Sequence, residues 1–113
     1  MSGIAGIFNV PANPDQLAQW SFNHAVHHVE INAAILKATG ITVPSYVLDP
    51  FSPADMELWL YQHQTMHNTI DAILGIKGYD LTTVDWKDPT QLGGWIQGNA
   101  NEHFQAANLL EIG

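Results

Sequence analysis

The sequence predicts an all-α fold: a three-helix bundle with ordered apolar loops and an N-terminal arm, forming one domain over residues 1–113. Three observations lead to this prediction. Three prolines follow good helix-capping residues, and each begins a long stretch without another proline. Apolar residues recur at helical spacing through all three stretches. The chain is also too short for two domains of ordinary size.

The first helix is predicted over residues 14–39. In the tetrapeptide 13–16, Asn-Pro-Asp-Gln, Asn13 is the expected cap, proline occupies the first helical position, and Gln16 supplies an acceptor at the third. Gly40 is the expected stop, because glycine readily adopts the left-handed conformation that ends many helices. The helix also carries a second apolar edge, which must be covered by the loops, the arm or another subunit. This edge consists of Phe22, Val26, Val29, Ala33 and Leu36.

The second and third helices follow the same design. Residues 52–55 (Ser-Pro-Ala-Asp) begin a helix predicted over 53–74, with its stop at Gly75. Residues 88–91 (Asp-Pro-Thr-Gln) begin a helix predicted over 89–111, close to the chain end at Gly113.

The segments between the helices are apolar rather than polar. We expect residues 41–51 and 76–87 to lie over the bundle, and Pro44 and Pro50 limit any strand in the first of them. The N-terminal arm, residues 2–10, is expected to pack on the same body or to reach a neighbouring subunit.

A repeated motif is the most specific signal in the sequence. The motif is Trp-x3-His/Asn-x3-His, and it begins at the same distance from the cap of each predicted helix. Its copies are Trp20-His24-His28, Trp59-His63-His67 and Trp95-Asn99-His103. In each helix the motif lies on the apolar stripe, which is about 80° wide in the first helix. In an up–down–up bundle, residues near the middle of every helix meet at one level. We therefore expect the five histidines and Asn99 to converge in the core within about 5.4 Å, one helical turn.

Several interpretations of a buried histidine layer remain open, among them a proton switch or a cofactor pocket. A metal-free polar layer can fix the register of a bundle, but every buried polar group must then find a partner or cost about 1–3 kcal/mol. A metal site is the alternative, because imidazole is the commonest ligand for transition metals. A metal-dependent enzyme of unknown substrate is a third possibility, since an open coordination position could activate water.

Nitrogen donors suit zinc or iron better than magnesium or calcium, which prefer oxygen. His27 lies on the flank of the first stripe, whereas Glu30 points away from it. The predicted metal site comprises His24, His28, His63, His67 and His103, with Glu102 as a further ligand or as a residue that orients a ligand.

The paired histidines His24-x3-His28 and His63-x3-His67, with His103 and Glu102, resemble the hemerythrin and DinB-like helical bundles. Metals in those families sit at mid-bundle on His-x3-His pairs and a histidine from another helix. The resemblance implies a metal-binding bundle.

Three segments, residues 7–31, 59–68 and 78–86, are similar to small uncharacterised tailed-phage proteins. This resemblance implies a structural or accessory role in a phage and no particular chemistry. The expected partners are a second copy of the chain or other virion proteins. The expected location is the host cytoplasm or the virion.

Composition excludes several other classes of function. A net charge of -8 and the absence of arginine argue against binding to nucleic acid. The absence of cysteine excludes disulfides, thiolate metal sites and cysteine nucleophiles. With 46% hydrophobic residues the chain can form a core, yet no apolar run reaches the roughly 18 residues that span a membrane.

Overall fold

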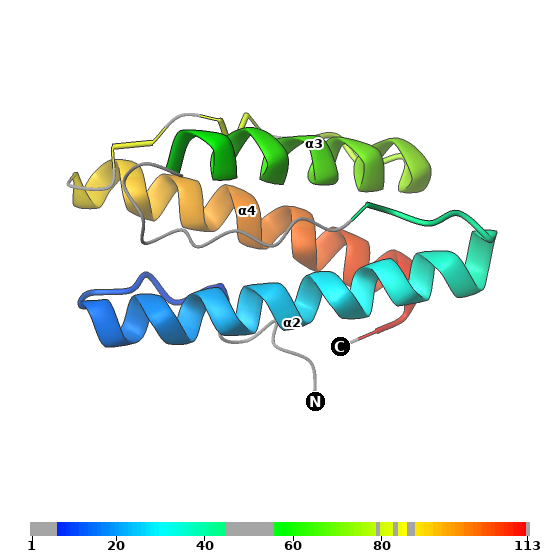
Figure 1. Ribbon diagram of the computed structural model, residues 1–113, viewed down its shortest axis with the longest axis horizontal. Coiled ribbons are helices and arrows are strands. Elements are labelled where there is room, and N and C mark those ends of the chain that lie inside the picture. Colours follow the sequence, from blue (N-terminus) through cyan, green and yellow to red (C-terminus); the bar gives the residue numbers. More distant parts are fainter. Residues whose placement is uncertain (1–6, 45–55, 79, 83, 86–87, 113) are drawn as a thin grey trace.

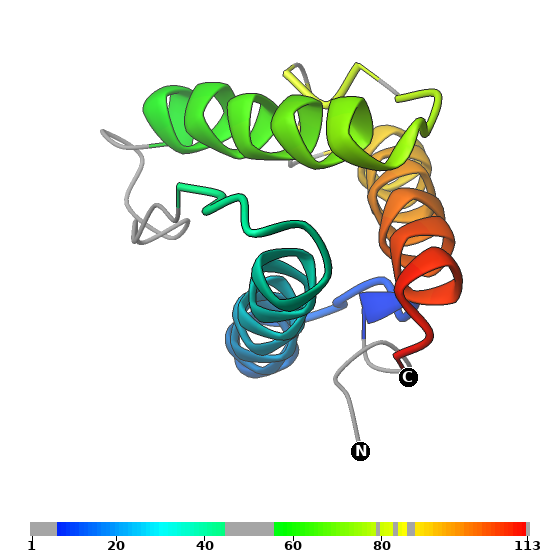
Figure 2. The same cartoon turned by 90° about the vertical axis from the view of Figure 1, so that its right-hand side faces the viewer.

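The computed structural model describes residues 7–44, 56–78, 80–82, 84–85 and 88–112. It confirms the predicted all-α fold. The three helices are α2 (Pro14–Thr39), α3 (Met56–Leu74) and α4 (Pro89–Leu110), and no strand occurs within the described ranges. In a view nearly along α2, the three helices surround a common core and α3 lies across the view, inclined to α2 (Figure 2).

The predicted capping of α2 is confirmed at both ends. Asn13 Oδ1 accepts a hydrogen bond from the Gln16 backbone N–H at 2.8 Å, and Gln16 Oε1 accepts one from the Ala12 N–H at 2.8 Å. At the other end Gly40 has φ 76° and donates its N–H to Leu36 O. These bonds satisfy backbone groups that have no partner within the helix.

Helix α4 begins as predicted and ends one residue earlier. The Asp88 side chain accepts hydrogen bonds from the backbone N–H groups of Thr90 and Gln91. The helix ends at Leu110, where Glu111 adopts the left-handed conformation with φ 57°. The predicted cap at Ser52 lies outside the described residues.

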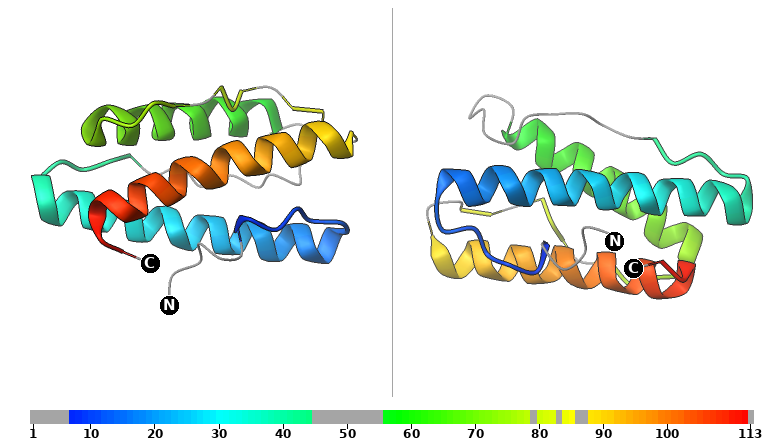
Figure 3. Two further views of the ribbon diagram at one scale, coloured as in Figure 1. Left: turned by 180° about the vertical axis from the view of Figure 1, so that it is seen from behind. Right: turned by 90° about the horizontal axis from the view of Figure 1, so that it is seen from below.

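All three helices run in the same direction (Figures 1 and 3), so the expected up–down–up arrangement is wrong. The three tryptophans that begin the motif copies lie together at one end of the bundle. Their ring centroids are 5.6 Å apart for Trp20–Trp95 and 5.7 Å apart for Trp59–Trp95. A second apolar cluster at the other end includes Ile35, Leu74 and Leu110. An antiparallel α3 would have placed Trp59 at the end opposite Trp20.

The connection between α3 and α4 shows how the chain returns to start another parallel helix. Ile76 packs in the cluster at the C-terminal ends of the helices, whereas Leu81 is buried among the tryptophans. Leu81 also donates its N–H to Gln64 Oε1 at 2.6 Å and accepts from Trp95 Nε1 at 3.0 Å. The described part of this segment therefore lies along the bundle, as predicted for residues 76–87. Residues 45–51 of the other predicted loop lie outside the described residues.

The N-terminal arm packs on the same body where it is described. Ile7 is fully buried in the tryptophan cluster, and its carbonyl accepts a hydrogen bond from Trp20 Nε1 at 3.2 Å. Phe8 meets Phe104 of α4 edge-on, with ring centroids 6.4 Å apart. The arm therefore covers the space between α2 and α4 near their tryptophans.

The second apolar edge of α2 remains exposed. Phe22 is 66% exposed, Val29 65% and Leu36 48%, so the described parts of the loops and of the arm leave these side chains uncovered. Coverage by another subunit stays a prediction. Among the described residues, no helix is both long and apolar enough to cross a bilayer.

Candidate metal centre

The parallel helices arrange the repeated motif in layers across the core. Since each copy starts at the same depth, equivalent residues of the three helices meet at every level. Along the bundle, the layers are Trp20, Trp59 and Trp95; His24, His63 and Asn99; His28, His67 and His103; and Ile31, Ile70 and Ala106. The histidines and Asn99 thus lie between two apolar layers.

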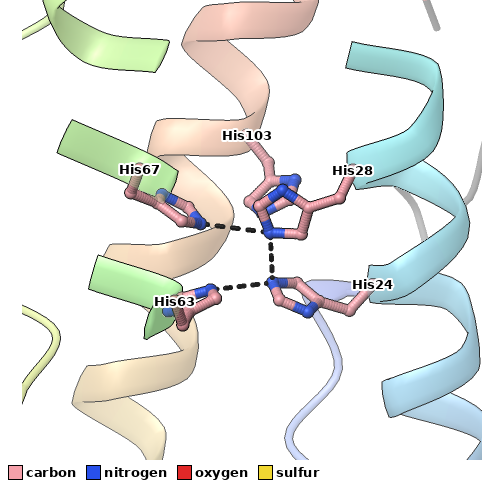
Figure 4. A group of neighbouring side chains, drawn as sticks. All are labelled: His24, His28, His63, His67 and His103. Carbon is pink, nitrogen blue, oxygen red and sulfur yellow. Dashed lines mark hydrogen bonds between the residues drawn. The ribbon is translucent and has the colours of Figure 1, made fainter. Parts of the chain in front are cut away.

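The five histidines of the motif converge, as the sequence predicts. One ring nitrogen from each lies within 4.8 Å of the corresponding atoms of the other four, and no ring is more than 6% exposed. Figure 4 shows His24 and His28 from α2 facing His63 and His67 from α3, with His103 of α4 beside His28. The members of this histidine cluster are His24, His28, His63, His67 and His103.

Four of the rings direct Nε2 toward one another. His24 Nε2 lies 3.0 Å from His28 Nε2 and 3.1 Å from His63 Nε2, and His28 Nε2 lies 3.2 Å from His67 Nε2. In Figure 4 the dashed lines trace three sides of a four-sided figure. The ring planes of two of these histidines are set by stacking on the tryptophan layer, with Trp20 on His24 and Trp59 on His63 at centroid separations of 4.7 Å each.

Neutral imidazoles cannot satisfy all these contacts. Each Nε2 carries either one proton or one lone pair, so four such atoms joined by three contacts form at most two linear N–H···N bonds. In addition, Nδ1 of His28, Nδ1 of His63 and Nε2 of His103 are buried without a hydrogen-bond partner among the described residues. A metal ion would remove the conflict between the Nε2 atoms, because every lone pair could then point at it.

The spacing of the nitrogens also fits a metal. With bonds of about 2.1 Å, neighbouring ligand nitrogens lie about 3.0 Å apart in an octahedron and about 3.4 Å apart in a tetrahedron. The observed separations of 3.0–3.2 Å lie within this range. The residues present therefore suit a nitrogen-bound transition metal such as iron or zinc.

Burial keeps the cluster uncharged at neutral pH. Burial first, and then the neighbouring imidazoles of His67 and His27, lower the pKa of His24 from 6.5 to about 3, and burial lowers the pKa of His67 to about 4. The pKa values of His28, His63 and His103 also lie well below 6.5, first because of burial and then because the rings face one another. Neutral rings retain the lone pairs that ligation requires.

Glu102 lies behind one histidine of the cluster. Its Oε1 is 3.4 Å from His67 Nδ1, and the side chain is 1% exposed. A proton on Nδ1 directed at this carboxylate leaves the lone pair of His67 on Nε2, which faces His28. Of the two roles predicted for Glu102, this position favours orienting a ligand over acting as one.

Asp71, which was not among the residues predicted for the site, extends this arrangement. Asp71 is 7% exposed. Its burial raises the pKa of its carboxyl group to about 8, and a hydrogen bond to Glu102 and the negative charge of Glu102 act in the same direction. Gly78 covers the pair so closely that a Cβ there would lie 2.6 Å from Asp71 Oδ2. The signal was present, because Asp71 continues the i, i+4 spacing of His63 and His67 along α3.

Replacing Asp71 with asparagine should stabilise the protein at alkaline pH. A pKa raised above its unfolded value of 3.8 means that stability is lost as pH rises toward 8, because the unfolded carboxyl releases its proton first. Asparagine has nearly the same shape and no proton to lose. Urea denaturation at about pH 8 should show a gain of at least about 1 kcal/mol, which shrinks toward acid pH. Equal stabilities at alkaline pH would contradict a protonated Asp71.

His27 is closer to the site than its predicted position on the flank suggested. It is fully buried, and its Nδ1 lies 2.7 Å from His103 Nδ1. Burial lowers the pKa of His27 to about 4, so one of these two neutral rings must donate. When His103 is the donor, its Nε2 keeps a lone pair for a metal.

Comparisons with family models, curated proteins and solved structures find no match to this chain. The resemblance to hemerythrin and DinB-like bundles therefore rests on the histidine arrangement alone. The similarity to tailed-phage proteins stays a prediction from the sequence.

Proposed function

We propose that this chain is a small metal-binding helical protein that holds a transition-metal ion, iron or zinc, in the histidine cluster. The convergence of five buried ring nitrogens within 4.8 Å carries the proposal. Its proposed ligands are His24, His28, His63, His67 and His103, with Glu102 orienting His67. The short Nε2 contacts support it, since neutral rings alone leave at least one of them without a hydrogen bond.

The surroundings of the cluster favour binding over catalysis. Tryptophans close one end of the cluster and aliphatic side chains close the other, and none of these residues is more than 9% exposed. A substrate would reach the ion only if the helices separated. A structural or accessory role, in a phage particle or elsewhere, fits such a closed site better than turnover does.

Metal analysis of the untagged protein tests the proposal. Elemental analysis after purification, followed by dialysis against Fe²⁺ or Zn²⁺, should give roughly one ion per chain. Free metal at about 1,000 times its Kd should stabilise the fold by about 4 kcal/mol, which thermal denaturation would register as a higher Tm.

A matched pair of variants makes the result specific. His63→Leu should abolish most of the metal-dependent rise in Tm. Met66→Leu, a buried change of similar volume in the same helix, should retain it. Absence of metal from the wild type, with no change in Tm on adding either ion, would favour a metal-free polar layer.

A second candidate function is self-association through the exposed edge of α2. Its residues, Phe22, Val26, Val29, Ala33 and Leu36, are spaced 4-3-4-3 along the helix, as in helices that pack on another helix. A second copy of this chain is the proposed occupant. Sedimentation equilibrium should show a dimer that Val29→Glu dissociates, and a monomeric wild type would contradict it.

A further inference from the structure

A further buried polar side chain, that of Asn99, lies beside the histidine cluster. Asn99 occupies the position in α4 that His24 and His63 occupy in their helices, four residues after the tryptophan of the motif. It is fully buried. An amide in this layer needs an explanation, because a buried polar group without partners is destabilising.

The amide oxygen of Asn99 faces the same space as the imidazole nitrogens. Asn99 Oδ1 lies 3.2 Å from His24 Nε2, a separation like those between the ring nitrogens themselves. The oxygen thus stands beside His24, a histidine of its own layer. Its Nδ2 is buried without a hydrogen-bond partner among the described residues, so hydrogen bonding of the amide nitrogen does not account for its place.

We infer that Asn99 Oδ1 is a sixth metal ligand, so that the ion is held by two stacked triangles of donors with one donor from each helix in each triangle. One triangle is His24, His63 and Asn99; the other is His28, His67 and His103. Two such triangles form an octahedron. The inference rests on the proposed function, because it describes how the same site holds its ion.

The geometry of the cluster agrees with six-coordination better than with four. The four separations between neighbouring donors, 3.0, 3.1, 3.2 and 3.2 Å, begin at the roughly 3.0 Å edge of an octahedron with bonds of about 2.1 Å, and all are shorter than the roughly 3.4 Å edge of a tetrahedron. A tetrahedral ion would also bind only four of the five histidines, so one buried ring would not coordinate it. Six-coordination favours iron over zinc, which is almost always four-coordinate in structural sites.

The parallel arrangement of the helices explains why six donors are available. Each helix contributes two positions four residues apart, which lie on one face and one turn apart. Because all three copies run in the same direction from the same depth, the first positions form one triangle and the second positions form the next. An antiparallel helix would have presented its pair in the reverse order.

Co²⁺ is a suitable probe, because its visible absorption is strong in a tetrahedral site and weak in an octahedral one. Equilibrium dialysis of the wild type against Co²⁺ should show binding, and the spectrum should be of the weak type. Asn99→Leu should bind Co²⁺ at least about ten-fold more weakly. Asn99→Asp, which keeps an oxygen donor at the same place, should restore the affinity and the weak spectrum.

Asn101→Leu provides the matched control, since Asn101 is an exposed asparagine of the same helix. This variant should bind like the wild type. Circular dichroism of each metal-free variant shows whether the fold is intact, and Asn99→Asp keeps the test valid if Asn99→Leu fails to fold. Strong tetrahedral absorption by the wild type, or unchanged affinity and spectrum in folded Asn99→Leu, would overturn the sixth ligand while leaving metal binding in place. No Co²⁺ binding by the wild type, together with no binding of iron or zinc, would overturn both proposals.

Discussion

Lowering the pH from about 7 to about 5 is expected to unfold the metal-free protein cooperatively. Six histidines are buried, and the pKa of each lies well below its usual value of 6.5, with those of His27 and His67 at about 4 and that of His24 at about 3. Unfolded histidines take up protons near pH 6.5, whereas the buried rings do not. The unfolded state therefore gains protons first as the pH falls.

The sign and size of the effect follow from this difference. Stability is fully present above about pH 6.5 and falls as the pH drops toward the folded pKa values. Each histidine that is protonated in the unfolded state but not in the folded state lowers the free energy of unfolding by about 1.4 kcal/mol per pH unit, or by about 2 kcal/mol at pH 5. Six of them amount to about 12 kcal/mol, comparable with the whole stability of an ordinary domain, which is about 5–15 kcal/mol. Asp71 opposes this loss, since its raised pKa favours the folded state at acid pH, but it is a single group.

Far-ultraviolet circular dichroism of chelator-treated protein across this range would measure the transition. His28→Leu removes one of the six groups, and its transition should move to lower pH and become less steep. Tyr61→Phe, at a residue 67% exposed, serves as a control that leaves the transition in place. Helix content that stays constant from neutral pH to pH 5 would contradict burial of the histidines in their neutral form.

Much of the fold and of the cluster could be predicted from local sequence signals. Asn13 and Asp88 mark helix starts because their side chains accept hydrogen bonds from nearby backbone N–H groups, an interaction that needs no tertiary structure. The common spacing of tryptophan and histidine from each cap likewise fixes both the face and the depth of the motif. These two quantities were enough to predict that His24, His63 and His103 meet.

Helix direction could not be predicted in the same way. It depends on where the connecting segments run, and the sequence of residues 76–88 shows that they are apolar without showing which end of the bundle they reach. In the structure Leu81 binds back to Gln64 and Trp95, and these long-range hydrogen bonds hold the returning segment along the helices. Asp71 was missed for a related reason. Its importance comes from Glu102 on another helix and from the close approach of Gly78.

Replacing Trp95 with alanine is expected to destabilise the protein by about 3–5 kcal/mol, the usual effect of removing a large aromatic side chain from a core. Trp95 is 5% exposed and contacts the tryptophans of both other helices, with centroid separations of 5.6 and 5.7 Å. It also donates a hydrogen bond to Leu81 O, which ties the returning segment to α4. The substitution would therefore weaken helix packing and the α3–α4 connection together.

Urea denaturation at neutral pH would measure this loss, and two further variants separate its causes. Trp95→Phe keeps an aromatic ring but gives up the hydrogen bond to Leu81, so it should lose less than the alanine variant. Tyr61→Ala removes an aromatic side chain that is 67% exposed on α3 and should change stability by less than about 0.5 kcal/mol. Because the tryptophan layer also separates the histidine cluster from one end of the bundle, Trp95→Ala should admit water to the cluster and make the acid transition begin at higher pH. A loss in Trp95→Ala no greater than in Tyr61→Ala would mean that the three helices do not meet at this layer.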